Sequence, residues 1–73
     1  MKQMTRSELE ATDYGRGAAR FITGARYAVV TNDPTSWGRL YHVISTHRTE
    51  SAATKRLRQQ AQNTGRVQLV EIA

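Results

Sequence analysis

The chain has 73 residues and a formal net charge of +5, because eleven lysines and arginines stand against six acidic residues. A chain of this length holds one domain with a small core, whose stability is marginal unless a partner adds to it. The absence of cysteine excludes a disulfide framework and any thiolate-based metal site. Hydrophobic packing, with or without oligomerisation, therefore has to hold the fold together.

The distribution of apolar residues gives no sign of a membrane. No apolar run approaches the roughly 20 residues that a membrane-spanning helix requires. Met1 to Leu9 lacks the apolar centre of a signal peptide. These features predict a cytoplasmic protein without a membrane partner.

Residues 1–25 are predicted to form a helical or irregular segment ahead of the main fold. The stretch Thr5–Glu8 matches a capping box and predicts a short helix over roughly Arg6 to Thr12. Isolated helices of this length are marginal, so we expect this one to be either docked or frayed. Glycines on both sides of Arg16 mark a turn, and Ala18 to Ile22 reads as one helical turn or a short strand.

A β-hairpin is predicted next. Tyr27 to Thr31 is β-branched and aromatic and stops at the turn signal Asn32-Asp33-Pro34. Leu40 to Thr46 has the same character, and the loop between the two runs is short enough for antiparallel pairing.

The centre of that loop sets the expected register. Centring it near residues 35–36 pairs Val30 with Tyr41 and Ala28 with Val43 on one face. Both faces of the hairpin carry apolar side chains, so both need cover. The opposite face is expected to carry Tyr27, Val29, Leu40, His42 and Ile44.

The main helix is predicted over Thr49 to Thr64. Thr49 suits the N-cap, and Glu50 lies in the first turn, where the helix dipole favours a negative charge. Gly65 is the expected left-handed residue after the last turn. The apolar stripe of this helix consists of Ala53, Leu57 and Ala61.

Arg66 to Ile72 is the third predicted strand, and it completes an α+β fold of the type β-β-α-β over residues 26–73. A strand–helix–strand connection makes the second and third strands parallel. The expected order is therefore 2-1-3, a three-stranded sheet with the main helix on one face. Residues 1–25 are expected to cover the other face, the one with Tyr27, Val29, His42 and Ile44, and a homodimer through that face is the alternative.

Nine of the eleven cationic residues are arginines, whose planar fork of donors matches phosphate or carboxylate. The candidate partner-binding cluster is Lys55, Arg56 and Arg58 on the helix, with Arg48 before it and Arg66 after it. Cations on one surface give salt-dependent affinity for a polyanion without any sequence reading. The alternatives are a solvated helix face and an arginine excess that only reflects a GC-rich genome.

Four further residues are candidates for contact with a partner. Arg16 and Arg20 belong to a second basic group, which also includes Arg26, although no phosphate-loop motif accompanies them. A structural turn around Arg16 is the alternative. Trp37 in the hairpin loop suits stacking on a base or anchoring a protein interface, and equally suits capping the core. Tyr27 is the remaining aromatic candidate, on a strand.

The sequence favours neither catalysis nor metal binding. His42 and His47 are expected on opposite strand faces, which makes them poor joint ligands. Ser45 and other hydroxyls lie near His47 in the chain, yet neither an oriented base nor an oxyanion hole can be identified. We therefore expect a protein that is not an enzyme and uses no cofactor and no metal.

A hairpin leading into Thr49–Ala52 and a basic helix resembles the small sheet-plus-helix modules by which phage integrases bind arm-type DNA. The resemblance covers about half of the chain and rests on the order of the elements. Those modules place three strands before the helix, whereas here a strand is predicted after it. The resemblance therefore assigns the chain to no family.

Two hypotheses for function follow from the sequence. The first is a small basic non-enzymatic binding protein that contacts nucleic acid or an acidic protein surface through its Arg-rich helix. The alternative is an inhibitor or adaptor of the kind that viruses and mobile elements encode, which binds one host protein through the apolar second sheet face.

Overall fold

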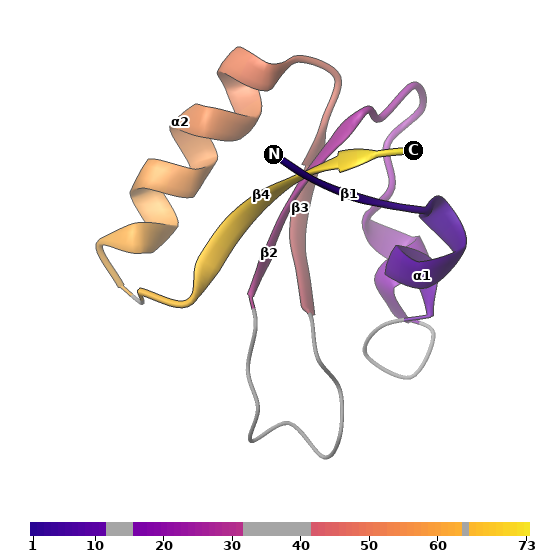
Figure 1. Cartoon of the computed structure of the whole chain (residues 1–73), viewed down its shortest axis with the longest axis horizontal. Helices are drawn as coiled ribbons and strands as arrows, with labels where there is room; N and C mark the ends of the chain where they lie inside the picture. Colours follow the sequence, from indigo (N-terminus) through magenta and orange to yellow (C-terminus); the bar gives the residue numbers. More distant parts are fainter. Residues whose placement is uncertain (12–15, 32–41, 64) are drawn as a thin grey trace.

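The structure, a computed structural model, describes residues 1–11, 16–31, 42–63 and 65–73. In this part of the chain the protein has an α+β fold with a four-stranded mixed sheet and one main helix (Figure 1). The elements in chain order are β1 (Lys2–Met4), α1 (Arg6–Glu10), the 3₁₀ helix η1 (Arg16–Arg20), β2 (Tyr27–Thr31), β3 (His42–His47), α2 (Glu50–Ala61) and β4 (Val67–Ile72).

The sheet has the order β1-β4-β2-β3, and β2 is antiparallel to both of its neighbours. The predicted arrangement of the three main strands is thereby confirmed. The fourth strand, β1, was not predicted and pairs in parallel with the edge of β4. The residues of β1 have little intrinsic preference for a strand. The backbone hydrogen bonds to β4 must therefore stabilise the extended conformation of Lys2, Gln3 and Met4.

The register of the hairpin differs from the prediction. Val30 pairs with Val43 instead of Tyr41, and the pairing shifts between Val29 and Val30, so that Ala28 lies opposite Thr46. The shift leaves Ile44 as an extra residue, which is a β-bulge. Strand propensity and loop length do not reveal a bulge, because an extra residue in one strand changes neither of them.

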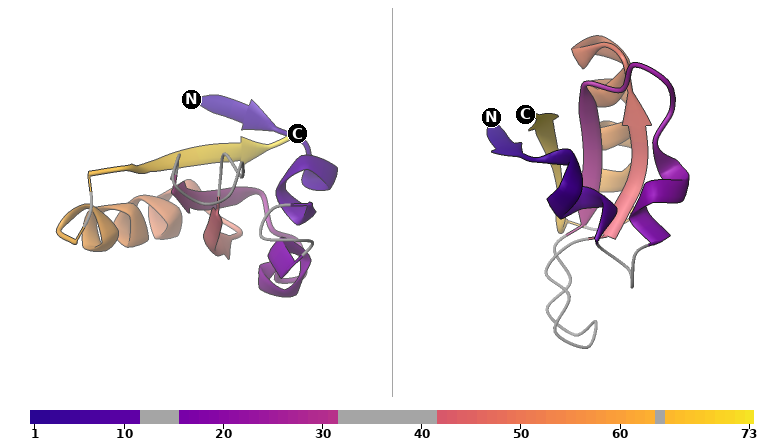
Figure 2. Two further views of the ribbon diagram at one scale, coloured as in Figure 1. Left: turned by 90° about the horizontal axis from the view of Figure 1, so that it is seen from below. Right: turned by 90° about the vertical axis from the view of Figure 1, so that its right-hand side faces the viewer.

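Residues of the N-terminal segment complete the core on one face of the sheet. Met4 and Leu9 are buried together with strand residues, and Phe21 packs against them. Figures 1 and 2 show α1 and η1 on one side of the sheet and α2 on the other. The strand residues in this cluster are Ala28, Val30, Val43 and Val70.

The face assignment is therefore opposite to the expected one. Side chains alternate along β2, so Val29 and Tyr27 point away from the N-terminal segment and toward α2. On the α2 side, Val29 and Ala53 are fully buried. The alternating direction of strand side chains divides them between two faces of the sheet, but it does not predict which face the helix covers.

Local hydrogen bonds fasten the N-terminal segment. The Thr5 side chain accepts from the Glu8 amide while the Glu8 carboxylate accepts from the Thr5 amide, which confirms the predicted capping box. The buried Thr46 hydroxyl donates to the Arg20 carbonyl at 2.6 Å and accepts from the Ile22 amide at 3.1 Å. These bonds hold residues 20–22 against β3.

The main helix begins as predicted and ends earlier. Thr49 is the N-cap, and its side chain accepts from the Ala52 amide. The C-cap is Gln62 in a right-handed conformation. The predicted left-handed role of Gly65 is wrong: the glycine with positive φ in the described chain is Gly24, at 75°, in the turn before β2.

We expect Leu9→Ala to lower the free energy of unfolding by about 2–5 kcal/mol, because it opens a cavity beneath the sheet. Ile22→Ala is the matched control, since the Ile22 side chain is exposed and its truncation should cost less than about 0.5 kcal/mol. Urea denaturation followed by circular dichroism measures both. Equal effects of the two substitutions would show that the N-terminal segment is not part of the core.

Candidate functional site

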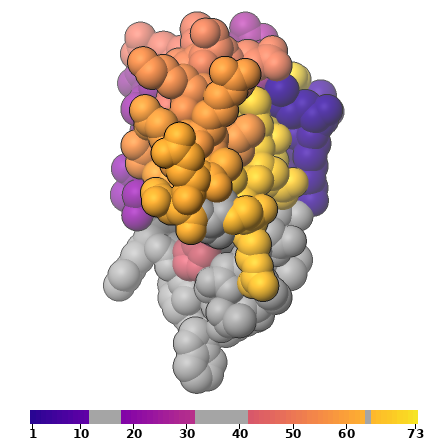
Figure 3. All heavy atoms as spheres, turned by 90° about the vertical axis from the view of Figure 1, so that its left-hand side faces the viewer, coloured from indigo at the N-terminus to yellow at the C-terminus, as the bar shows by residue number. Residues whose placement is uncertain are grey.

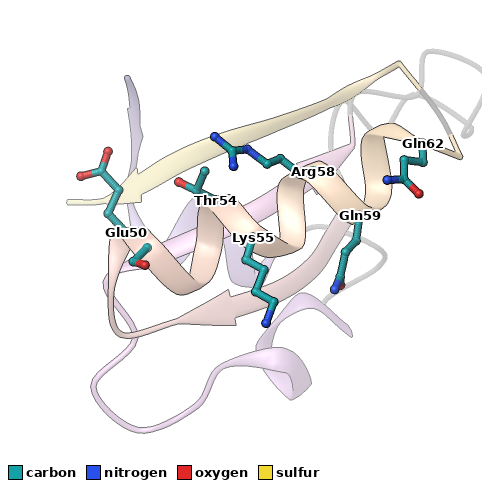
Figure 4. Close-up of a pocket in the computed structure, with 7 residues that line it drawn as sticks. Glu50, Thr54, Lys55, Arg58, Gln59 and Gln62 are labelled. Atoms are coloured by element: carbon teal, nitrogen blue, oxygen red, sulfur yellow. The ribbon is translucent and has the colours of Figure 1, made fainter.

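The side of α2 that faces away from the sheet is a polar surface with a shallow depression. Figure 4 shows its side chains spread along the helix, and Figure 3 shows α2 beside β4 on this side of the molecule. The depression is lined by residues of one helix only, so it is an open surface and not an enclosed cleft. We call it the outer face of α2; its residues are Glu50, Ser51, Thr54, Lys55, Arg58, Gln59 and Gln62.

Two of the predicted site residues lie together on this outer face. Lys55 and Arg58 are exposed, and within the described residues neither forms an ion pair. Glu50 is the acidic residue among those that line the surface. Both cations can therefore reach a partner, and they outnumber the negative charge of the same surface.

Arg48 and Arg20 are exposed, but each also ties parts of the fold together. The Arg48 Nε donates to the Thr23 carbonyl at 2.7 Å, which links the start of α2 to the turn before β2. An Arg20 Nη donates to the Ile44 carbonyl at 3.4 Å, beside the bulge in β3. These arginines are less available to a partner than Lys55 and Arg58.

Two polar side chains lie together on the face of β3 that α2 covers, and the charge of a third, from α2, acts on one of them. Ser45 and His47 share the face of β3 that α2 covers, and Ser45 Oγ lies 2.8 Å from His47 Nε2. Arg56 is half-buried, and its charge acts on His47. We call Ser45, His47 and Arg56 the seam cluster.

The electrostatics of the seam cluster disfavour a second positive charge. The pKa of His47 lies below the ordinary value for histidine, first because of burial and second because of the Arg56 charge. The Arg56 Nε is buried without a hydrogen-bond partner among the described residues. A half-buried guanidinium whose Nε is unsatisfied is an unusual feature in a folded protein.

Two further predicted site residues, Tyr27 and Arg66, do not line the outer face of α2. Tyr27 is half-buried in β2, opposite His47 and Glu71, which makes it part of the sheet and not a free stacking platform. Arg66 is exposed between α2 and β4 and interacts within the protein. Arg16 begins η1, and Trp37 lies outside the described residues.

One expectation about the histidines is wrong. His42 pairs with Thr31 and His47 pairs with Tyr27, which places both histidines on the same face of β3. The bulge at Ile44 reverses the alternation between them. The same reversal hides the seam cluster from the sequence pattern, although the spacing of Ser45 and His47 on one strand is an available signal.

Within the described part of the chain, no group of three or more His, Asp or Glu side chains lies close enough to hold a metal ion. No helix in that part is long and apolar enough to cross a membrane. No protein-family model, curated protein or solved structure matches the chain. Its function has to be inferred from the two surfaces described above.

Acidification should destabilise the fold through His47. Because its pKa is lower in the folded state than in the unfolded chain, the stabilisation is complete above about pH 6.5 and is lost as the pH falls through the folded-state value. We expect the free energy of unfolding to fall between pH 7 and pH 5, and His47→Gln to make that fall smaller. His42→Gln is the control; if it flattens the profile equally, the assignment to His47 is wrong.

Replacement of Arg56 by methionine tests the electrostatics of the seam. Arg56→Met keeps the apolar stem and removes a buried unpaired donor, so we expect no loss of stability and a gain of up to about 1 kcal/mol. The pKa of His47, followed by NMR, should rise but stay below the ordinary value because burial remains. Arg58→Met, on the outer face, should leave the pKa of His47 unchanged. A larger change of this pKa with Arg58→Met than with Arg56→Met would contradict the assignment of Arg56 to the seam cluster.

Proposed function

We propose that this protein is a non-enzymatic binding protein that contacts the phosphate backbone of nucleic acid through the outer face of α2. The observation that carries the proposal is the pair of exposed cations, Lys55 and Arg58, on one helix face without ion pairs in the described residues. Cations in this arrangement neutralise phosphates and release condensed counterions. The net charge of +5 favours the same class of partner over long range.

The shape of the surface also suits a backbone contact. A helix of 12 residues extends for about 18 Å, which is long enough to follow several phosphates of one strand. Gln59 and Gln62 on the same surface supply amide groups that hydrogen-bond phosphate or sugar oxygens. We therefore expect binding with little preference for base sequence.

The seam cluster supports a role other than catalysis. A serine next to a histidine is the pair that hydrolases use, and there the histidine must accept a proton and become positively charged. Burial and, after it, the charge of Arg56 oppose that step, because both lower the pKa of His47. This environment suits a binding protein better than a general base.

The alternative of a viral-type inhibitor or adaptor started from an uncovered apolar sheet face. In the described structure Met4, Leu9 and Phe21 pack on the Ala28 and Val30 face, and α2 covers the opposite one. This cover favours α2 over the sheet as the place where a partner binds. Contact with an acidic protein surface through α2 stays a prediction, and it is the outcome expected if nucleic acid fails to bind.

Titration against fluorescent duplex DNA and RNA at about 50 and 200 mM salt tests the proposal. We expect affinity to fall as salt rises, and the double substitution of Lys55 and Arg58 by alanine to reduce the slope of log affinity against log salt by about 2. Ser51→Ala with Thr54→Ala is the matched control on the same surface, and it should keep the slope. Absence of binding at the lower salt concentration would exclude nucleic acid as the partner.

A further inference from the structure

The seam cluster has the features of a small anion site. Its members come from two elements, since Ser45 and His47 belong to β3 and Arg56 belongs to α2. All three side chains are half-buried, whereas Lys55 and Arg58 on the outer face are exposed. Among the described strands β3 lies at the edge of the sheet, so no further described strand closes the seam on that side.

Arg56 brings a positive charge that the described protein does not neutralise. The ion pair found in the described residues joins Arg6 to Glu10, at the other side of the sheet. Partly desolvated charges are expensive unless they are paired, and an arginine at such a position forms strong bidentate bonds to phosphate. An anion at the seam would therefore stabilise Arg56 more than it would an exposed arginine.

The described side chains that directly face His47 carry no negative charge. From β2 the facing side chain is Tyr27, and from α2 it is Arg56. Glu71 lies one strand further, opposite Tyr27, and accepts a hydrogen bond from Gln3. Ser45 Oγ and His47 Nε2 share one hydrogen bond, so with a neutral His47 the pair can donate one further hydrogen bond to an oxygen of a ligand. With a protonated His47 both side chains can donate to the ligand.

We infer that the seam cluster binds one phosphate group, with Arg56 as the bidentate donor and with Ser45 and His47 as further donors. The inference rests on the proposed function in one respect, because a backbone phosphate of bound nucleic acid is one source of the group. A free phosphate or a nucleotide has the same chemistry and is the other source. A bound phosphate favours the protonated form of His47, so binding and protonation strengthen each other.

The chain contains only two histidines, so NMR of the ring Cε1–H resonances reports the site directly. The experiment titrates inorganic phosphate into the full chain at constant pH, with sodium chloride adjusted to constant ionic strength. We expect a saturable shift for His47 and none for His42, together with a rise in the pKa of His47 by about 1 unit at saturation. No shift of His47, or linear shifts of both histidines, would overturn the inference.

Two variants distinguish a phosphate site from a general salt effect. Arg56→Lys keeps the charge and removes the fork, so we expect phosphate affinity to fall at least about tenfold. Arg58→Lys makes the same change on the exposed side of the same helix and should leave the phosphate response intact. Backbone amide spectra verify that both variants are folded, and equal responses of the two would contradict a role for Arg56.

A second series with a short single-stranded oligonucleotide identifies the source of the phosphate. Saturation of the His47 shift at lower concentration than with inorganic phosphate supports a backbone phosphate. A response to phosphate alone keeps the seam site but contradicts nucleic acid as its source. Nucleic-acid binding that needs Lys55 and Arg58 but leaves His47 unshifted preserves the proposed function and overturns the seam site.

Discussion

The central strand β2 imposes the main constraint on this small protein. Its residues Ala28, Val29 and Val30 are consecutive and all fully buried. Because successive side chains of a strand point to opposite faces, three buried neighbours require cover on both sides of the sheet. A single helix covers only one face of the sheet. This chain of 73 residues therefore uses its N-terminal segment to cover the other face.

The packing of α2 on one face of the sheet decides which sides of this helix are available to a partner. The helix meets the sheet through the small residue Ala53, which is fully buried, while Lys55 and Arg58 stay exposed on the opposite side. Arg56 lies between these two sides, half-buried, and its charge acts on His47 in the edge strand β3. Neighbouring basic residues of one helix therefore have different environments, and only the exposed ones suit a purely electrostatic contact.

The β-bulge at Ile44 connects the fold to the seam cluster. On an unbroken extension of the Val30–Val43 register, Ser45 would lie opposite Ala28 and face the N-terminal layer. The extra residue turns Ser45 and His47 toward α2, where Arg56 lies. The Arg20 side chain donates to the Ile44 carbonyl, so the N-terminal layer contacts the bulge that forms the cluster. The polar groups of the seam thus depend on an irregularity in the sheet and on the segment that contacts it.

The sequence by itself determined the elements whose signals are local. Thr5 with Glu8 and Thr49 mark helix starts through hydrogen bonds to amides three residues away, and the runs around Val30 and Val70 mark strands by composition. Only the tertiary structure decided the pairing of β1 with β4, the bulge, the face that α2 covers and the meeting of Arg56 with His47. These features depend on contacts between residues far apart in the chain, where a shift of one residue in register moves a side chain to the other face without any change in local propensity.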